Sequence, residues 1–441
     1  MPRWQWVLMH LIRRLWVRAT LLGVLGVAAA MIATTADTLI PISFPFTIEA
    51  ESIDRILNIL ATSMLAVTTF SLSVMVSAYG AASTNVTPRA IKLLTEDHTT
   101  QNVLSAFVGS FLFSVVGIIA LQVGAYGDQG RILLFAVTLG VLALVVISLL
   151  RWIDHLTRFG RVGETTAQVE QATRRAMDEY LREPCLGGQP RIDADLADVD
   201  TTAQVCAARI GYVQHIDMSA LTECCEKMSV RIFLSVVPGA FVYKGAVLGW
   251  FECDNSSEVD TAALSAAICD AVTIDDDRSF DQDPRFGLAV LSEIACRALS
   301  PGVNDPGTAI DVIGRQTRLL SRWAEGPSSA NTDSDSRSTS APRYPRVYIP
   351  ALSTADLFED AFMLIARDGA ALVEIQLRLQ KALRALGELG DTPFREAASK
   401  QSLLARDRAM QALTLEADRE RVLAVLETPA EHGQPSTHDK Q

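Results

Sequence analysis

The chain has 441 residues, too many for one ordinary hydrophobic core, so two or three domains are expected. Its mean hydropathy of +0.22 is high for a soluble protein, and its net charge of −12 comes almost wholly from the second half. An acidic second half argues against a nucleic-acid partner and is typical of cytoplasmic solubility. The seven cysteines contain no C-x-x-C pair, which favours reduced thiols over a disulfide framework or a zinc site.

Four apolar stretches near the N-terminus are long enough to cross a bilayer, which takes roughly 20 helical residues. They cover about residues 19–36, 56–88, 103–123 and 132–150. Lipid offers no hydrogen-bond partners to the backbone, so each stretch is expected to be helical. The sequence therefore predicts a basic N-terminus over residues 1–18, a four-helix transmembrane domain over residues 19–150, and the lipid bilayer as a partner.

Basic residues indicate how these helices are oriented. They gather in three zones that fall on one side of the membrane if the chain crosses four times: Arg3, Arg13, Arg14 and Arg18; Arg89 and Lys92; and Arg151, Arg158 and Arg161. The positive-inside rule then predicts that both termini are cytoplasmic. A cleaved signal peptide is the competing interpretation of the first stretch, but cleavage would leave three crossings and break this charge pattern.

The second stretch carries small and hydroxyl-bearing residues at every third or fourth position, which places them in one helical stripe. Its polar members include Thr62, Thr69, Ser73 and Ser77. Close helix packing explains such a stripe, because small residues let backbones approach. A pore lining is the alternative, in which hydroxyls replace part of an ion's hydration shell. The four stretches bury no ionisable residue, which disfavours a coupled transporter.

The remaining chain is predicted to be cytoplasmic, and the fourth helix is expected to continue to about Leu181. The predicted divisions are a cytoplasmic helix and connection over residues 151–200, an α+β domain over 201–325, a disordered linker over 326–345, a helical bundle region over 346–427 and a polar tail over 428–441. Within the bundle region, the pattern favours one helix over about residues 356–389 and another over 393–427.

The α+β domain combines strand-like and helical patterns. Residues 209–216 alternate like a strand, Asp217 is placed to cap a short helix, and strands resume at 230–236. Gly239 and Gly245 then suit tight turns at positive φ. These features predict a small β-barrel-like element.

Two copies of one helix-start signal, Asp283-Pro284 and Asp305-Pro306, mark the most distinctive stretch of the chain. Aspartate caps free N–H groups, and proline takes the first helical position, where no N–H is needed. Helices are therefore predicted over about residues 285–300 and 307–323.

The segments that contain these two signals, residues 282–288 and 298–306, resemble a family of predicted bacterial membrane proteins, the domain of unknown function DUF2254. The resemblance extends over about residues 10–425 and includes the multi-span N-terminus, Thr69–Ser71, Pro88-Arg89 and residues 242–245. The chain departs from the pattern in its linker and around Asp368. Membership implies an integral protein of the bacterial inner membrane, but it brings no activity, substrate or catalytic residue.

Polar residues of the distinctive stretch form a candidate ligand-binding set: Arg278, Asp281, Asp283, Glu293, Arg297, Asn304 and Asp305. Clustered carboxylates suit a hard cation, but their spacing does not fit a twelve-residue calcium loop. Capping and solvation explain the aspartates more simply. Glu293 and Arg297 are four residues apart in the favourable order for an ion pair. No metal ligand set, cofactor or catalytic residue is predicted.

Two functional classes follow from these patterns. An enzyme is the least supported class, because the sequence has no nucleotide-binding glycine loop, nucleophile elbow or histidine pair at metal spacing. The first remaining class is a membrane-anchored binding or regulatory module, whose cytoplasmic domain docks a partner protein or small ligand. The second is an oligomeric ion channel with the second and third helices around its pore. A homo-oligomer is expected.

Overall fold

The computed structural model describes residues 5, 6, 8, 11, 15–34, 49–158, 160–192, 204–253, 260–326 and 342–427. The chain is mostly helical and divides into two compact units, the first of residues 6–165 and the second of residues 166–441 together with residues 1–5. The predicted polar tail and all but the ends of the predicted linker lie outside the described residues.

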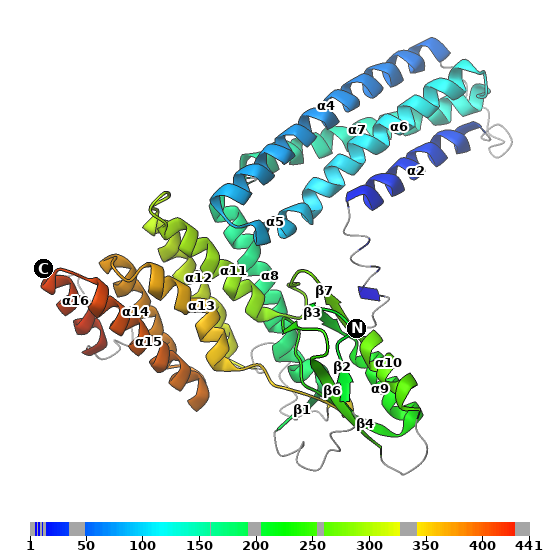
Figure 1. Ribbon diagram of the computed structural model, residues 1–441. Helices are drawn as coiled ribbons and strands as arrows, with labels where there is room; N and C mark the ends of the chain where they lie inside the picture. The colour runs from blue at the N-terminus through cyan, green and yellow to red at the C-terminus, as the bar shows by residue number, and fades with distance from the viewer. Residues whose placement is uncertain are drawn as a thin grey trace, which may run out of the picture. The chain divides into compact units, whose positions relative to one another are not determined.

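The first unit is built from long apolar helices. They are α2 (Leu15–Thr34), α4 (Ala50–Asn85), α6 (His98–Gln122) and α7 (Asp128–Arg158), with the short helix α5 (Pro88–Thr95) between α4 and α6. Figure 1 shows the four long helices running alongside one another. In the part of the chain that the structure describes, these four helices are the ones long and apolar enough to cross a membrane. The prediction of four helical stretches is confirmed.

Helix α6 lies innermost in this bundle, with about half of its residues buried. It approaches α2 closely, since a Cβ atom on Gly26 would lie 2.9 Å from the carbonyl oxygen of Gly109. Glycines at both positions let the two backbones meet, as in membrane helix pairs. Large apolar side chains, such as Leu25 of α2 and Phe70 of α4, are more than 60 % exposed on the outer faces. Those faces suit contact with lipid tails.

The second unit contains two open sheets. The larger one has the order β1 (Gly188–Pro190), β8 (Tyr344–Ile349), β4 (Val230–Leu234), β6 (Val247–Cys253) and β2 (Gln204–Cys206). The smaller one has the order β5 (Phe241–Val242), β3 (Gly211–Ile216) and β7 (Val272–Asp275). Strand β8 pairs in parallel with β1 and with β4. All the other strand pairs are antiparallel. Helices α9 (Met218–Met228) and α10 (Thr261–Ala271) share their apolar core.

The predicted β-barrel-like element is wrong, because neither sheet closes among the described strands. Gly239 and Gly245 do adopt positive φ, at 90° and 85°. The chain between them, however, leaves β4 in the larger sheet, forms β5 in the smaller sheet and returns to β6 in the larger one. The two turns therefore connect different sheets and do not curl one sheet onto itself.

The rest of the second unit is helical. It consists of α8 (Val162–Arg182), α11 (Pro284–Leu299), α12 (Pro306–Ala324), α13 (Thr354–Asp368), α14 (Val373–Gly387), α15 (Thr392–Ala412) and α16 (Glu416–Glu427). The first residues of α8 belong to the first unit. The caps predicted for α9, α11 and α12 are confirmed, because Asp217, Asp283 and Asp305 each accept a backbone N–H of the first helical turn.

Three helices predicted as continuous are interrupted. The fourth membrane helix does not run on to Leu181, since Gly160 at φ 75° separates α7 from α8. The helix predicted over residues 356–389 breaks at Gly369, where a Cβ atom would lie 2.5 Å from Ile375 Cγ2. The last predicted helix breaks between α15 and α16. Apolar periodicity continues through each break, so it did not reveal the change of direction.

Helix α11 meets α8 at Gly287, and this contact leads to a prediction. A Cβ atom on Gly287 would lie 1.8 Å from Oγ1 and 2.7 Å from Cβ of Thr173, a buried, β-branched residue that cannot move aside. Gly287→Ala should therefore force the helices apart and lower the free energy of unfolding by about 1–3 kcal/mol. Thermal melting of the purified protein in detergent measures this effect.

The matched control is Gly163→Ala in α8, where a Cβ atom would meet no atom within 4 Å. Alanine favours the helix over glycine, so this variant should melt at or above the temperature of the wild type. Equal melting temperatures for the Gly287→Ala and Gly163→Ala variants would contradict the close packing.

Candidate functional site

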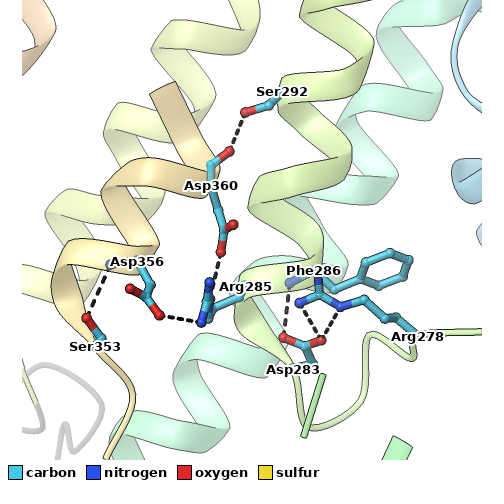
Figure 2. A network of polar contacts seen from close by, with 8 residues as sticks. All are labelled: Arg278, Asp283, Arg285, Phe286, Ser292, Ser353, Asp356 and Asp360. Atoms are coloured by element: carbon cyan, nitrogen blue, oxygen red, sulfur yellow. Dashed lines mark hydrogen bonds and ion pairs between the residues drawn. The ribbon is translucent and has the colours of Figure 1, made fainter. Parts of the chain in front are cut away.

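The polar network at the start of α11 is centred on a buried carboxylate, that of Asp283, whose side chain is 2 % exposed (Figure 2). Its Oδ1 atom accepts the backbone N–H of Phe286 at 3.1 Å. Its Oδ2 atom accepts two hydrogen bonds from Arg278, from Nε at 2.8 Å and from Nη2 at 2.7 Å. The guanidinium carbon of Arg278 lies 5.0 Å from the centre of the Phe286 ring. The local sequence thus supplies the cap, the counter-charge and the aromatic surface within nine residues.

This ion pair leaves no open position for a ligand at Asp283 Oδ2. Gly239, at φ 90°, approaches so closely that a Cβ atom would lie 2.1 Å from that oxygen. Glycine is required there both for its backbone conformation and for the space. The carboxylate is therefore covered by backbone on one side and by Arg278 on the other. The arrangement serves to fix the loop against α11.

Burial raises the pKa of Asp283 from its ordinary value of 3.8 to about 6, although the charge and hydrogen bonds of Arg278 and the N–H of Phe286 act in the opposite direction. The carboxyl group is still mainly ionised at neutral pH. It gains a proton in the mildly acidic range, where an ordinary aspartate does not.

A second ion-paired group joins α11 to α13 beside the first (Figure 2). Arg285 donates from Nη1 to Asp356 Oδ2 at 2.6 Å and from Nε to Asp360 Oδ2 at 2.7 Å. Two turns further along α11, the Ser292 hydroxyl lies 2.6 Å from the Asp360 carbonyl oxygen and receives a hydrogen bond from Gln316 Nε2 of α12. One face of α11 is thus held to both α13 and α12 through polar groups.

The structure does not gather the predicted ligand-binding set into one site. Arg278, Asp281 and Asp283 belong to the loop before α11, where Asp281 accepts a hydrogen bond from the hydroxyl of Ser279. Asp305 lies at the opposite end of α11, because its N–H donates to the carbonyl oxygen of Ala298 at 2.8 Å. A sixteen-residue helix is about 24 Å long, so the two Asp-Pro signals are far apart.

The other members of the set lie along or beyond α11. Glu293 and Arg297 are on α11 itself, and Arg297 is exposed. Asn304 adopts φ 50° in the turn before α12, a conformation that asparagine tolerates better than most residues. Asp305 is exposed and accepts hydrogen bonds from both the N–H and the hydroxyl of Thr308. Over the described ranges, no group of three or more His, Cys, Asp or Glu is placed to hold a metal ion.

The predicted pore-lining residues share one exposed face of α4. Thr62, Thr69, Ser73 and Ser77 are all exposed in the single chain. Three of their hydroxyls donate to the carbonyl oxygen four residues earlier on the same helix. In the single chain this stripe therefore lies on an outer face of α4, and both its packing against another helix and its role as a pore lining stay predictions.

Sequence reasoning missed the ion pairs that hold α8 to α12. Glu170 of α8 accepts hydrogen bonds from Arg315 Nη1 at 2.6 Å and from Arg318 Nε at 2.9 Å. Two turns later, Asp178 accepts one from Arg322 Nε at 2.9 Å. The signal was present in the sequence as acidic residues on one helix and arginines on another. The partners are about 145 residues apart, so only the fold pairs them.

Comparison with known proteins agrees with this architecture. The sequence model of a family described as "Predicted membrane protein (DUF2254)" matches residues 12–385. The chain belongs to this family. Its apolar helices, the Asp283 network and both Asp-Pro caps all lie within the matched region.

Curated relatives of this DUF2254 protein occur in mycobacteria. The chain is 26 % identical over 262 residues to the uncharacterized proteins Rv1290c of Mycobacterium tuberculosis and Mb1321c of Mycobacterium bovis, which covers 58 % of this chain and 50 % of each relative. The chain therefore spans about half the length of these relatives. No solved structure matches it.

The two Asp-Pro caps of this DUF2254 protein should respond differently to pH. The folded-state pKa of Asp283 lies above the unfolded value, so the folded protein binds more protons between pH 4 and 6. The free energy of unfolding contributed by this group should fall as pH rises through that window, by on the order of 2–3 kcal/mol. Melting temperatures of the wild type and Asp283→Asn across pH 4–6 measure it, and the variant should lack this component.

Asp305→Asn is the control, because hydrogen bonds from the side chain and backbone of Thr308 lower the pKa of Asp305. Its stabilising effect is lost only as pH falls below the unfolded value near 3.8, outside the tested window. A wild-type pH dependence that persists in Asp283→Asn would contradict the assignment.

Proposed function

We propose that this protein is a non-enzymatic, membrane-anchored regulatory module of the bacterial inner membrane. In this proposal the membrane helices influence the second unit, which lies in the cytoplasm and docks a partner. The observation that carries the proposal is the position of α8. Three residues separate this helix from the end of α7, and it is bound along its length to the helices of the second unit.

The contacts of α8 suit mechanical coupling, because they are charged, paired and spaced along the helix. Glu170 and Arg315 are only 19 % and 15 % exposed, so water screens their interaction less than that of a surface pair. Near the other end, Tyr180 stacks on Trp323 with ring centres 5.2 Å apart and accepts the N–H of Leu352. A helix held at both ends transmits displacement better than one held at a single point.

Two features support a cytoplasmic second unit. The basic zones of the sequence flank α2, α4 and α7 on the side predicted to face the cytoplasm. All seven cysteines are free thiols, which suits a reducing compartment. We propose a partner protein as the docked species rather than a metal ion, since Gly239 and Arg278 close the buried carboxylate of Asp283.

The proposed coupling predicts a difference in amide hydrogen exchange. In nanodiscs of thin and thick bilayers, the α7 helix must adjust to different hydrocarbon thickness. Wild-type protein should show exchange rates in α11 and α12 that differ between the two bilayers. Glu170→Gln, which removes the charge that binds Arg315 and Arg318, should abolish most of this difference while the membrane helices remain protected.

The matched control for coupling is Asp311→Asn. Asp311 also pairs with Arg315, but it lies on α12 itself and is 50 % exposed. This variant disturbs the same arginine without releasing α8, so it should retain the wild-type response to bilayer thickness. Identical exchange of α11 and α12 in thin and thick bilayers for the wild type would reject the coupling.

An oligomeric channel is the second candidate function, and the exposed stripe on α4 is the observation that favours it. Hydroxyls on an outer face are available to line a pore between several copies, and a homo-oligomer is proposed under either function. Against a pore, the hydroxyl hydrogens of Thr62, Thr69 and Ser73 are already donated within α4.

Ion flux from liposomes distinguishes the two functions. The regulatory module predicts that potassium and chloride flux from liposomes with protein does not exceed that from empty liposomes. Flux that is lost in Ser73→Leu but retained in Val76→Leu, an exposed apolar position beside the stripe, would establish the channel instead.

A further inference from the structure

A groove of about 790 Å³ lies in the first unit between α2, α6 and α7. Its volume falls within the range of small-molecule and cofactor pockets in proteins. Residues such as Leu22, Ala106 and Leu144 line one part of it with apolar surface. The other part is lined by polar groups from the start of α6 and the end of α7, among them Asn102 and Arg151.

The groove opens onto surface that suits lipid. Leu150 lines it and is 64 % exposed, and its neighbour Ile147 is 51 % exposed. On α2, Leu21 beside the lining residue Leu22 is 61 % exposed. Large apolar side chains on the outside of membrane helices face hydrocarbon, so an acyl chain can enter the groove from the side.

The polar end of the groove lies where the uncharged runs of two helices end. Arg151 is the first charged residue after the uncharged run of residues 132–150, and Arg18 is the last before the run that starts at residue 19. Such positions border the hydrocarbon core, where arginine side chains reach the headgroup region. Arg18 donates from Nη1 to Asn102 of the groove wall at 2.9 Å.

Arg151 is available to an outside anion. It is exposed, and over the described ranges no hydrogen bond or ion pair joins it to another residue. Among the neighbouring groups, Arg158 pairs with Asp154 at 3.3 Å, and the carboxylate of Asp97 lies 3.2 Å from His155 Nε2. Glu164 also lines the rim and adds a negative charge there. The hydrogen-bond donors of the Arg151 guanidinium are thus available to an anionic ligand.

The wall behind Arg151 is fixed in place. His155 lies 3.1 Å from the Thr100 hydroxyl, and its ring stacks on that of the buried Trp152 at 5.7 Å. The first turn of α6 is itself capped by Asp97, which accepts the N–H of Thr100 at 2.7 Å. A rigid wall lowers the entropy cost of ordering a ligand against it.

We propose that this groove binds one glycerophospholipid, with an acyl chain on the apolar surface near Ala106 and the phosphate on Arg151. Arginine binds phosphate through two parallel N–H donors, which gives the contact both strength and orientation. This lipid site stands independently of the coupling through α8.

The test uses full-length protein purified in a neutral detergent. A short-chain phosphatidylglycerol is titrated, and binding is followed by native mass spectrometry and by thermal melting. We expect one bound lipid per chain and a rise in melting temperature. Arg151→Gln should weaken apparent binding about tenfold, which corresponds to the loss of about 1.4 kcal/mol of interaction. Arg161→Gln, an exposed arginine that does not line the groove, should bind like the wild type.

A second pair of variants tests the apolar part of the groove. Leu144→Trp fills it from an exposed position that lines it, and this variant should also lose the lipid. Leu142→Trp places the same ring on the same helix outside the groove and should retain it. Melting without lipid shows that each variant is folded.

Two further ligands show whether binding requires both the phosphate and the acyl chains of the lipid. Diacylglycerol with the same chains and inorganic phosphate should each leave the melting temperature unchanged, because one lacks the phosphate and the other lacks the chains. Equal stabilisation by diacylglycerol, or by inorganic phosphate alone, would overturn the proposal. Equal binding by the Arg151→Gln and Arg161→Gln variants would do the same.

Discussion

The second unit depends on the contact of α8 with the helices of its core. Glu170 and Asp178 of α8 bind three arginines of α12, and the hydroxyl-bearing Thr173 between them faces Gly287 of α11. The ion pairs determine where α8 lies along α12, while the glycine determines how closely it approaches α11. Three residues separate α8 from the end of α7, so these contacts lie close in the sequence to the last apolar helix.

The buried network at Asp283 shows how one local signal acquires different roles in different surroundings. Asp283 and Asp305 each cap a helix that begins with proline, and each accepts a backbone N–H three residues on. Asp283 is enclosed by Arg278 and Gly239, and the loss of water around its carboxylate raises its pKa more than the ion pair with Arg278 lowers it. Asp305 stays exposed, and hydrogen bonds from the hydroxyl and the N–H of Thr308 lower its pKa. Their pKa values therefore shift in opposite directions.

The membrane unit presents two outward surfaces of different character. Three of the four hydroxyls in the stripe on α4 already donate within the helix, so this face is compatible with lipid or with another copy of the chain. The groove beside α7 combines apolar surface with an arginine that follows directly on an uncharged run of the helix. An amphipathic groove of this kind discriminates between ligands more strongly than a stripe does, because a ligand must match both its apolar surface and its charged group.

Local structure was largely predictable from the sequence, and the physical reason is that its determinants are short-range. Uncharged runs of about 20 residues specify membrane helices, and aspartate followed by proline specifies a helix start. The helix breaks at Gly160 and Gly369 were not predictable, since glycine is compatible with a helix until its neighbours require another conformation. The open sheets were missed because strands β1 and β8 pair across about 150 residues.

The sequence by itself determined the four apolar helices, the caps of α9, α11 and α12, and the family to which the chain belongs. Tertiary structure alone decided which charges are buried and with what partner. Arg278 and Asp283 could have been solvated loop residues, and Glu170 an ordinary surface acid, until packing removed the water around them. The burial of a charge depends on atoms from segments that are far apart in the sequence. The local sequence pattern does not show which of these segments will meet in the fold.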